Sequence, residues 1–359
     1  MAQKKGHSRT SNNGDIQAKT RTIQYNSLMN RLLIIDGNAM MHRAYHAIPP
    51  LTAPDGSVVN VVYGFATMLL RLYEVLAPHY VAVTFDRPSP TFRKKLFTGY
   101  QSKRPKMEET LVEQIPKVHA MVEAFDIPIF EKDGFEADDV IGTLATKVIS
   151  GKVKNIQVDQ VVIVTGDRDI LQLVNGEHIM VYMPTKGLSE GKIYQDIDVV
   201  ARLGIQPNQI TDYKGLAGDS SDNYPGVAGI GPKTAIALLE TFGTVETLYT
   251  ALKKHDAKLN QFSGSVIQKL KADEHNARLS KDLATIRTNV EFPIALSPIT
   301  SLNTKKSRMA LSAFHFHSLL KRMGVTSMTS ESDTPKIETI TSAADQQKVK
   351  SRGEQQELF

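Results

Sequence analysis

The stretch RLLIID, residues 31–36, decides the fold, because it is an apolar run that ends abruptly in an aspartate, Asp36. Three further apolar runs follow it, at residues 80–86 (YVAVTFD), 161–169 (VVIVTGDRD) and 178–183 (HIMVYM). A long apolar-rich segment, residues 58–76, lies between the first two runs and predicts a helix. Continuous apolar strands alternating with helices are typical of a parallel sheet covered on both faces. The sequence therefore predicts an α/β fold around a central, mostly parallel sheet.

The composition limits the possible functions. No apolar run reaches the roughly 18 residues that a membrane-spanning helix needs, and no signal-peptide pattern opens the chain. The chain has no cysteine, which excludes disulfides, thiolate zinc sites and cysteine nucleophiles and fits a reducing compartment. Any metal must therefore be bound by oxygen or histidine ligands.

The length of 359 residues allows two modest domains with tails. Residues 1–28 are polar and carry five basic side chains against one acid, so most of the net charge of +5 comes from them. We expect a disordered basic tail over 1–28, an α/β core over 29–206, a helical region over 207–325 and a flexible tail over 326–359. Because the rest of the chain is close to neutral, the net charge does not by itself indicate nucleic-acid binding.

Acidic residues follow the predicted strands. Asp36, Asp86 and Asp167 each end a strand or follow it closely, and Asp169 lies two residues further on. The carboxyl ends of parallel strands meet at one edge of a sheet, where ligands bind. An extended stretch would point Asp167 and Asp169 the same way. Each aspartate taken singly could instead be an ordinary turn or N-cap residue.

Two other stretches add five acids. GFEADDVIG (134–142) places Glu136, Asp138 and Asp139 in the first turn of a helix predicted over 136–149. One acid would complement the helix dipole, but three exceed that need. GLAGDSSDNYPG (215–226) supplies Asp219 and Asp222, either as a hydrophilic turn or as members of the same site.

So many carboxylates at one edge need cations. Two unit charges 4 Å apart repel by about 4 kcal/mol at an effective dielectric constant of 20. Oxygen ligands suit Mg²⁺ or Mn²⁺, and two such ions can activate a water and stabilise the leaving oxygen in phosphodiester cleavage. The chain has no Walker A sequence, so a P-loop NTPase is not expected.

Two segments could bind nucleic acid. RKKLFTGYQSKRPK (93–106) has six basic residues and no acid, with aromatic residues interleaved, and it predicts either a solvated loop or a single-strand site. PGVAGIGPKTA (225–235) predicts a sharp helix–hairpin–helix turn, which could be an ordinary connection or could bind a phosphate backbone. If these segments bind nucleic acid, the contacts are expected from Lys94, Lys95, Lys103, Gly229, Gly231, Lys233 and Thr234.

Five motifs together resemble the 5′ nuclease domain of bacterial DNA polymerase I and the related flap endonucleases, over roughly residues 30–325. They are IIDGNAMMHRAYHA (34–47), VTFDRPSPTFR (83–93), GFEADDVIG (134–142), VTGDRDILQL (164–173) and GLAGDSSDNYPGVAGIGPKTA (215–235). The resemblance implies a PIN-like fold, a helical arch at about 91–110 that passes a 5′ flap, and a hairpin that binds duplex DNA, often with a K⁺ ion. It implies a site for two Mg²⁺ or Mn²⁺ ions held by Asp36, Asp86, Glu136, Asp138, Asp139, Asp167, Asp169, Asp219 and Asp222. It also implies catalytic roles for Arg43, Arg93, Tyr100 and Arg104.

One position departs from the family pattern. The family's arch usually reads Tyr-Lys-x-x-Arg, whereas this chain reads YQSKR, with Gln101 after Tyr100. The lysine that would contact the scissile phosphate is therefore absent at its usual place. Lys103 or Lys94 could replace it, or cleavage could be slower.

The resemblance implies a structure-specific 5′ nuclease of DNA and of RNA primers on DNA, acting in Okazaki fragment maturation and repair. The expected protein is a monomer of the bacterial cytoplasm, associated with the nucleoid during replication. Fused relatives continue into a polymerase, so the short tail predicts a stand-alone nuclease or a truncated piece. The chain ends QQELF, similar to a bacterial sliding-clamp motif, with Gln355, Leu358 and Phe359 as the expected contacts.

Two other functions stay open at this point. A non-catalytic protein of the same fold could bind DNA junctions, although no expected carboxylate is missing. A PIN-like ribonuclease could act on RNA, although the glycine hairpin and the long arch favour DNA flaps.

Overall fold

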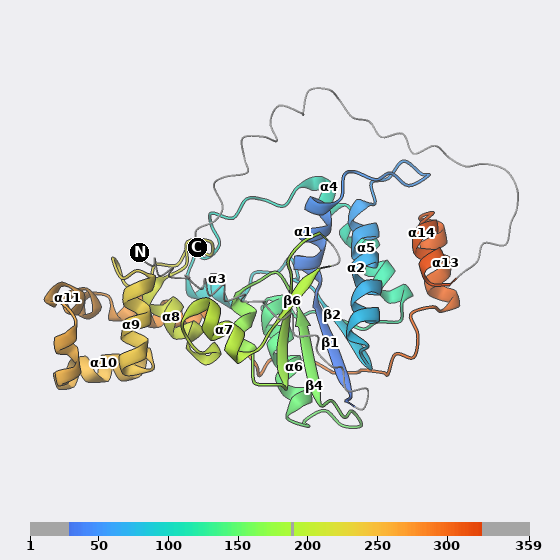
Figure 1. Ribbon diagram of the computed structural model, residues 1–359. Coiled ribbons are helices and arrows are strands. Elements are labelled where there is room, and N and C mark those ends of the chain that lie inside the picture. The colour runs from blue at the N-terminus through green and yellow to red at the C-terminus, as the bar shows by residue number, and fades with distance from the viewer. Residues whose placement is uncertain (1–28, 188–189, 325–359) are drawn as a thin grey trace, which may run out of the picture.

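The computed structural model describes residues 29–187 and 190–324, and they form an α/β domain followed by helices (Figure 1). The strands are β1 (Arg31–Asp36), β2 (Tyr80–Thr84), β3 (Ile129–Phe130), β4 (Gln160–Val164), β5 (Ile179–Pro184) and β6 (Gly191–Tyr194). The helices of the first domain are α1 (Gly37–Ala47), α2 (Asn60–Leu76), α3 (Phe92–Leu96), α4 (Glu109–Val112), α5 (Ile115–Ala124), α6 (Ala137–Ile149), η1 (Asp169–Leu173) and α7 (Asp196–Leu203). The later helices are η2 (Pro207–Gln209), α8 (Ile210–Ala217), α9 (Pro232–Phe242), α10 (Val245–Lys254), η3 (Ala257–Gln261), α11 (Gly264–Ala272), α12 (Glu274–Ala284), α13 (Lys305–Ala313) and α14 (His317–Arg322).

The sheet has the strand order β3-β2-β1-β4-β5-β6, and only β6 runs antiparallel to its neighbour. The chain crosses from β1 to β2 on one side and later reaches β4 on the other side. The carboxyl ends of β1 and β4 therefore flank the point where the strand order reverses, which is where open α/β sheets bind ligands. This arrangement confirms the predicted mostly parallel sheet.

Strand β1 is buried on both faces, as its continuous apolar run predicts. Leu32 and Ile34 belong to one core, which includes the apolar side of α6. Leu33 and Ile35 belong to the other core, which includes α2 and α5. The alternation of side chains along a strand thus gives the sheet two apolar layers from a single sequence run.

The helical region projects away from the sheet, with α8 nearest and α9 to α11 beyond it (Figure 1). Its acidic turn depends on two glycines that bring backbones together. Gly218 and Gly226 both have positive φ, and a Cβ on Gly226 would lie 2.2 Å from the amide nitrogen of Gly218. The turn between them, which carries Asp219 and Asp222, can therefore close only without these side chains.

After α12 the chain returns to the first domain. Val290 donates its N–H to the hydroxyl of Thr143 on α6, and the Ile299 N–H bonds the His79 carbonyl before β2. Helices α13 and α14 then pack beside α2 and α5, at the opposite end of the molecule from α9 (Figure 1). The sequence predicts one helical region over 207–325, and the structure shows that its last part covers the α/β core.

The basic segment contains little helix. Helix α3 ends at Leu96, and turns and an extended loop lead to the short α4 (Figure 1). Gln101 has a φ of 53°, which interrupts any helix. Because the segment also carries like charges and Pro105, a long helix is disfavoured there.

Most predicted elements are confirmed within one or two residues, apart from the two strands that precede acids. β2 ends at Thr84 and β4 ends at Val164, so Asp86 and Asp167 lie in the loops that follow. The predicted extended stretch from Asp167 to Asp169 is wrong, because the 3₁₀ helix η1 begins at Asp169. The sequence also predicts neither β3 nor β6, which are short edge strands.

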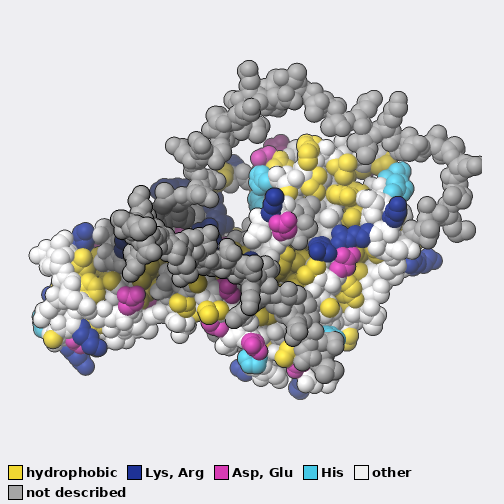
Figure 2. All heavy atoms as spheres, viewed as in Figure 1, with side chains coloured by type: hydrophobic (Ala, Val, Ile, Leu, Met, Phe, Trp, Pro, Cys, Tyr) yellow, Lys and Arg dark blue, Asp and Glu magenta, His cyan; other side chains and the backbone are white. Residues whose placement is uncertain are grey.

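The face of the molecule in Figure 2 carries charges of both signs. On the face in Figure 2, Lys and Arg side chains form several small groups interspersed with acids. In the part of the chain that the structure describes, none of the helices is long and apolar enough to cross a membrane.

The packing of α13 on the core gives a stability test. Leu311 is fully buried, whereas Met309 on the same helix is 63% exposed. Leu311→Ala should lower the free energy of unfolding by about 2–5 kcal/mol, because it leaves a cavity. Met309→Ala should change it by less than about 0.5 kcal/mol. Urea unfolding followed by circular dichroism measures both, and equal effects would contradict this packing.

Candidate active site

Asp36 joins the ends of the two central strands. Its Oδ1 accepts the Ala39 N–H at 2.9 Å and so caps α1, and its Oδ2 accepts the Thr165 hydroxyl at 2.6 Å. Thr165 directly follows β4. The carboxylate is therefore fixed at the crevice between β1 and β4, with 5% of its surface exposed.

Asp86 caps α6 from another strand. Its Oδ1 accepts the Ala137 N–H at 2.7 Å, at the first residue of α6, and its Oδ2 accepts the Asn38 side-chain amide at 2.8 Å. An acid from the β2 loop thus serves the N-terminus of α6. Asp139 also takes part in the cap, because its Oδ2 accepts the Glu136 N–H at 3.1 Å within a Glu136–Asp139 capping box, whereas Asp138 is free for another role.

Those three acids point in different directions. The Glu136 carboxylate accepts the Tyr100 hydroxyl at 3.1 Å. Asp138 accepts no hydrogen bond from any residue that the structure describes. Asp139 is fully buried, and its oxygens accept bonds from the Arg93 guanidinium and from the Arg287 N–H at 2.8 Å.

The remaining four acids lie on the helical side. Asp167 accepts the Asp169 N–H at 2.8 Å, which starts the turn of η1. The Lys214 ammonium on α8 bridges Asp169 and Asp219, with 2.6 Å to Asp219. Asp222 accepts the Arg104 guanidinium at 2.6 Å.

These residues surround a cleft of ≈ 920 Å³ between the sheet edge, the first turn of α6 and the basic segment. Seven of the nine predicted acids line it: Asp36, Asp86, Glu136, Asp138, Asp167, Asp169 and Asp222. Five basic or aromatic residues of the basic segment line it as well: Arg93, Lys94, Tyr100, Arg104 and Lys106. Sequence segments up to 186 residues apart, from Asp36 to Asp222, thus meet at one place.

The crowding raises several pKa values. Burial raises the pKa of Asp36 to about 6, against the hydrogen bonds from Ala39 and Thr165. Burial raises the pKa of Glu136 to about 7 although Arg93 opposes it, and that of Asp169 to about 6 although Lys214 opposes it. Burial and the charge of Asp167 raise the pKa of Asp138. The protein alone therefore stabilises these negative charges incompletely.

The donor set fits divalent cations. It consists of carboxylate oxygens, which Mg²⁺ and Mn²⁺ prefer, and Asp138 has no other described partner. Within residues 29–187 and 190–324, no three acidic or histidine side chains converge tightly enough to chelate an ion unaided.

Sequence comparison identifies the family. The 5′-3′ exonuclease N-terminal resolvase-like domain matches residues 31–204, and the 5′-3′ exonuclease C-terminal SAM fold matches residues 205–307. The chain belongs to the 5′-3′ exonuclease family. This finding confirms the family that the motifs predict.

Individual relatives agree with this assignment. The chain is 33% identical over 297 residues to a 5′-3′ exonuclease of Aquifex aeolicus, covering 82% of this chain and 96% of that protein. It is 38% identical over 298 residues to DNA polymerase I of Caldicellulosiruptor bescii, covering 82% of this chain and 34% of that protein. The chain thus spans about a third of the polymerase relatives that it matches.

A solved structure supports the fold. The flap endonuclease of bacteriophage T5, in a complex with DNA and metal ions, aligns with a TM-score of 0.59 at 19% identity. The alignment covers 82% of this chain and 97% of that chain. It confirms the predicted α/β architecture with a C-terminal helical region.

Within this 5′-3′ exonuclease fold, Arg93 is buried in an ion-pair network. It is 2% exposed, and it donates to both oxygens of Asp139 and to the carbonyls of Leu283 and Thr285. Glu136 lies 3.2 Å from the same guanidinium. Its predicted catalytic role and the predicted metal contact of Asp139 stay predictions, because here the two side chains mainly satisfy each other.

Other predicted residues lie outside the cleft lining. Arg43 donates to the Gly187 carbonyl at 2.8 Å, and Lys95 and Lys103 are exposed on the basic segment. Asp219 lies behind Lys214, where it also accepts the Ser221 N–H at 2.7 Å. The clamp residues at the C-terminus lie outside the described residues.

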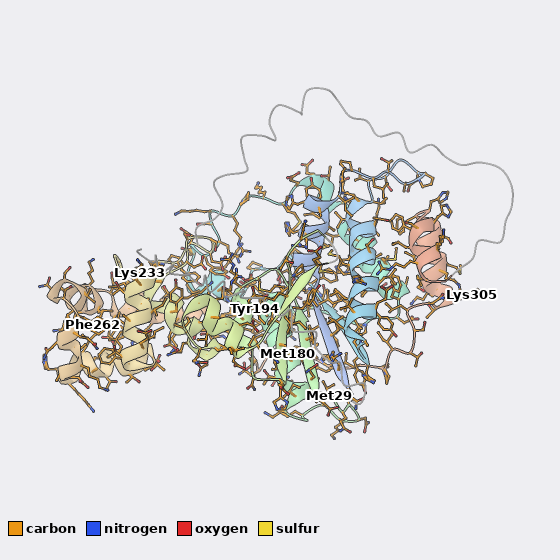
Figure 3. The ribbon with its side chains drawn as sticks, in the orientation of Figure 1. Met29, Met180, Tyr194, Lys233, Phe262 and Lys305 are labelled. Carbon is orange, nitrogen blue, oxygen red and sulfur yellow. The ribbon has the colours of Figure 1, made fainter. Side chains whose placement is uncertain are left out.

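The predicted hairpin is a separate surface. Gly229 has a φ of 74°, and Gly231 precedes α9, whose first turn carries Lys233 and Thr234. Lys233 is exposed and projects from α9, away from the sheet (Figure 3). The free N–H groups at this helix start suit a phosphate.

Sequence reasoning missed Lys214, Thr165 and Asn38. Lys214 lies five residues before Asp219, whereas side chains that meet on a helix are three or four residues apart. The two meet because the chain turns at Gly218, which has positive φ. No periodicity could have revealed that contact. Thr165 could have been found, since it directly follows a predicted strand beside Asp36.

The raised carboxyl pKa values predict how metal stabilises the protein. The folded forms of Asp36, Glu136 and Asp169 bind protons more tightly than the unfolded chain, so stability from these groups is lost as pH rises from about 4 to about 7. A divalent ion would replace those protons. Mg²⁺ should therefore raise the melting temperature more at pH 7.5 than at pH 5, relative to chelator, and less in Asp138→Asn. Equal Mg²⁺ shifts at both pH values would contradict this electrostatic account.

Proposed function

We propose that this protein is a divalent-metal-dependent, structure-specific 5′ nuclease that hydrolyses phosphodiester bonds of DNA and of RNA primers on DNA. The observation that carries the proposal is the single cleft in which seven carboxylates face the basic segment. Family membership supports the same activity. We place the protein in Okazaki fragment maturation and in repair.

The residues divide the chemistry among them. Two Mg²⁺ or Mn²⁺ ions held by Asp36, Asp86, Asp138 and their neighbours would supply an activated water and stabilise the leaving oxygen. Thr165 and Asn38 orient two of these carboxylates by the hydrogen bonds already described. Tyr100, stacked near Tyr224 at 6.4 Å between ring centroids, holds the basic segment against the acidic turn.

The substrate follows from the charges around the cleft. Lys94 and Arg104 line it from the basic segment, so a single strand that enters would meet positive charge before it reaches the carboxylates. Lys233 on the hairpin offers a second contact for duplex phosphates, without base readout. We therefore propose 5′ flaps and nicked or gapped duplexes as substrates, with a K⁺ ion at the hairpin as a further prediction.

The biological setting is proposed from the sequence and the relatives. We propose a monomer of the bacterial cytoplasm that works at the nucleoid. Gln355, Leu358 and Phe359 are proposed to bind a sliding clamp, since an apolar pair on a tether can enter a pocket of a partner. We keep the boundary between core and helical region at residues 206/207.

A labelled 5′ flap on duplex DNA tests the activity. Wild type should cleave it with Mg²⁺ and not with chelator. Asp138→Asn should lower the rate by about 100-fold or more, because it removes the carboxylate that has no other described partner. Asp126→Asn, at an exposed acid remote from the cleft, is the matched control and should cleave at the wild-type rate. Metal-independent cleavage, or none by wild type, would refute the proposal.

Gln101 provides a test of the basic segment. Its amide donates to the Tyr100 hydroxyl at 3.2 Å, and its N–H donates to the Asp222 carbonyl at 2.8 Å. Gln101→Lys adds a positive charge at the cleft and should speed flap cleavage by about tenfold at limiting substrate. Gln101→Met, which adds no charge, should give no gain. An unchanged rate in the lysine variant would show that this position does not contact the reacting phosphate.

A further inference from the structure

The cleft acids are unequally supplied with counter-ions. Among the described residues, no lysine, arginine or histidine forms an ion pair with Asp36, Asp86, Asp138 or Asp167. Three of the four acids on the helical side are paired, since Lys214 bridges Asp169 and Asp219 and since Arg104 binds Asp222. The two halves of the acidic cluster therefore differ before any ion binds.

Lys214 is held firmly in that position. Its side chain is 14% exposed, and its own carbonyl accepts the Gly218 N–H that ends α8. Next to it, Gly215 packs so closely on α12 that a Cβ would lie 2.9 Å from the Ala277 carbonyl oxygen. The ammonium thus comes from a fixed helix and does not sample the surface.

The ammonium is charged under ordinary conditions. Burial alone would lower the pKa of Lys214, but Asp169 and Asp219 raise it above its usual value. A positive charge already stands between two acids of the proposed two-ion site.

The neighbouring Tyr224 has a buried hydroxyl whose hydrogen-bonding capacity is unused. Tyr224 is 3% exposed, and within the described part of the chain its hydroxyl has no hydrogen-bond partner. A buried hydroxyl without a partner is costly, and a water carried by an incoming ion would supply one.

We propose that the Lys214 ammonium occupies the second cation position and competes with the second divalent ion for Asp169 and Asp219. This inference rests on the proposed two-ion function. The unpaired acids would hold the first ion, and a second ion would bind more weakly because the Lys214 charge repels it and already occupies two of its carboxylates. Lys214 is a positioning residue that makes the affinity for the second ion lower than that for the first. In the metal-free protein it reduces the repulsion between Asp169 and Asp219.

Titration of the metal-free protein with Mn²⁺, followed by the electron paramagnetic resonance signal of free Mn²⁺, tests this directly. Lys214→Met should bind the second Mn²⁺ at least about tenfold more tightly than wild type, because a repelling charge is gone. Lys214→Gln, which keeps hydrogen-bond donors, should behave likewise if the methionine variant folds poorly. Lys214→Arg keeps the charge and should resemble wild type.

The matched control is Lys281→Met, because Lys281 bridges Asp212 and Glu246 away from the cleft and is 22% exposed. It should leave both Mn²⁺ affinities unchanged. A second affinity that is unchanged or weaker in both neutral Lys214 variants would overturn the proposal. Since the titration needs no cleavage, wild type that binds Mn²⁺ but cuts no flap would refute the nuclease function separately.

Discussion

One buried guanidinium holds together the parts of this protein on which its cleft depends. Arg93, at the base of the basic segment, binds Asp139 on α6 and two carbonyls at the end of α12. A buried ion pair of this kind is weak proof of stability, but removing one partner leaves an unpaired charge and costs several kcal/mol. The pair therefore fixes where three chain segments meet, and Arg93 lines the cleft together with Glu136, 3.2 Å away.

The three carboxylates of the GFEADD stretch have the same chemistry but different surroundings. Asp139 is used for the internal pair, Glu136 faces the basic segment, and Asp138 faces the strand-end acids. The N-terminus of α6 is capped from outside by Asp86. Local sequence accounts for one acid at this helix start. In the structure Glu136 and Asp139 form a capping box, and Asp86, a residue 51 positions before Ala137, accepts a further N–H.

Much of the molecule could be predicted because it follows local rules. The apolar runs of β1, β2 and β4 and the helical spacing of α6 specify the sheet and its acidic edge. The edge strands β3 and β6 were beyond prediction because two to four residues carry too little pattern. The contacts of Lys214 and Arg93 were also beyond it, since they join residues across a chain reversal or nearly 200 positions apart.

The return of the chain after α12 changes how the helical region can move. Residues 286–322 cross α6 and end beside α2 and α5. The region from η2 to α12 is therefore joined to the core by the chain at both of its ends. A body tethered at both ends cannot swivel freely about a single linker. This region is also packed on the sheet, since Ile210 and Leu216 belong to the same apolar core as Leu32 and Ile34. We therefore expect the hairpin before α9 to keep a nearly constant distance from the cleft.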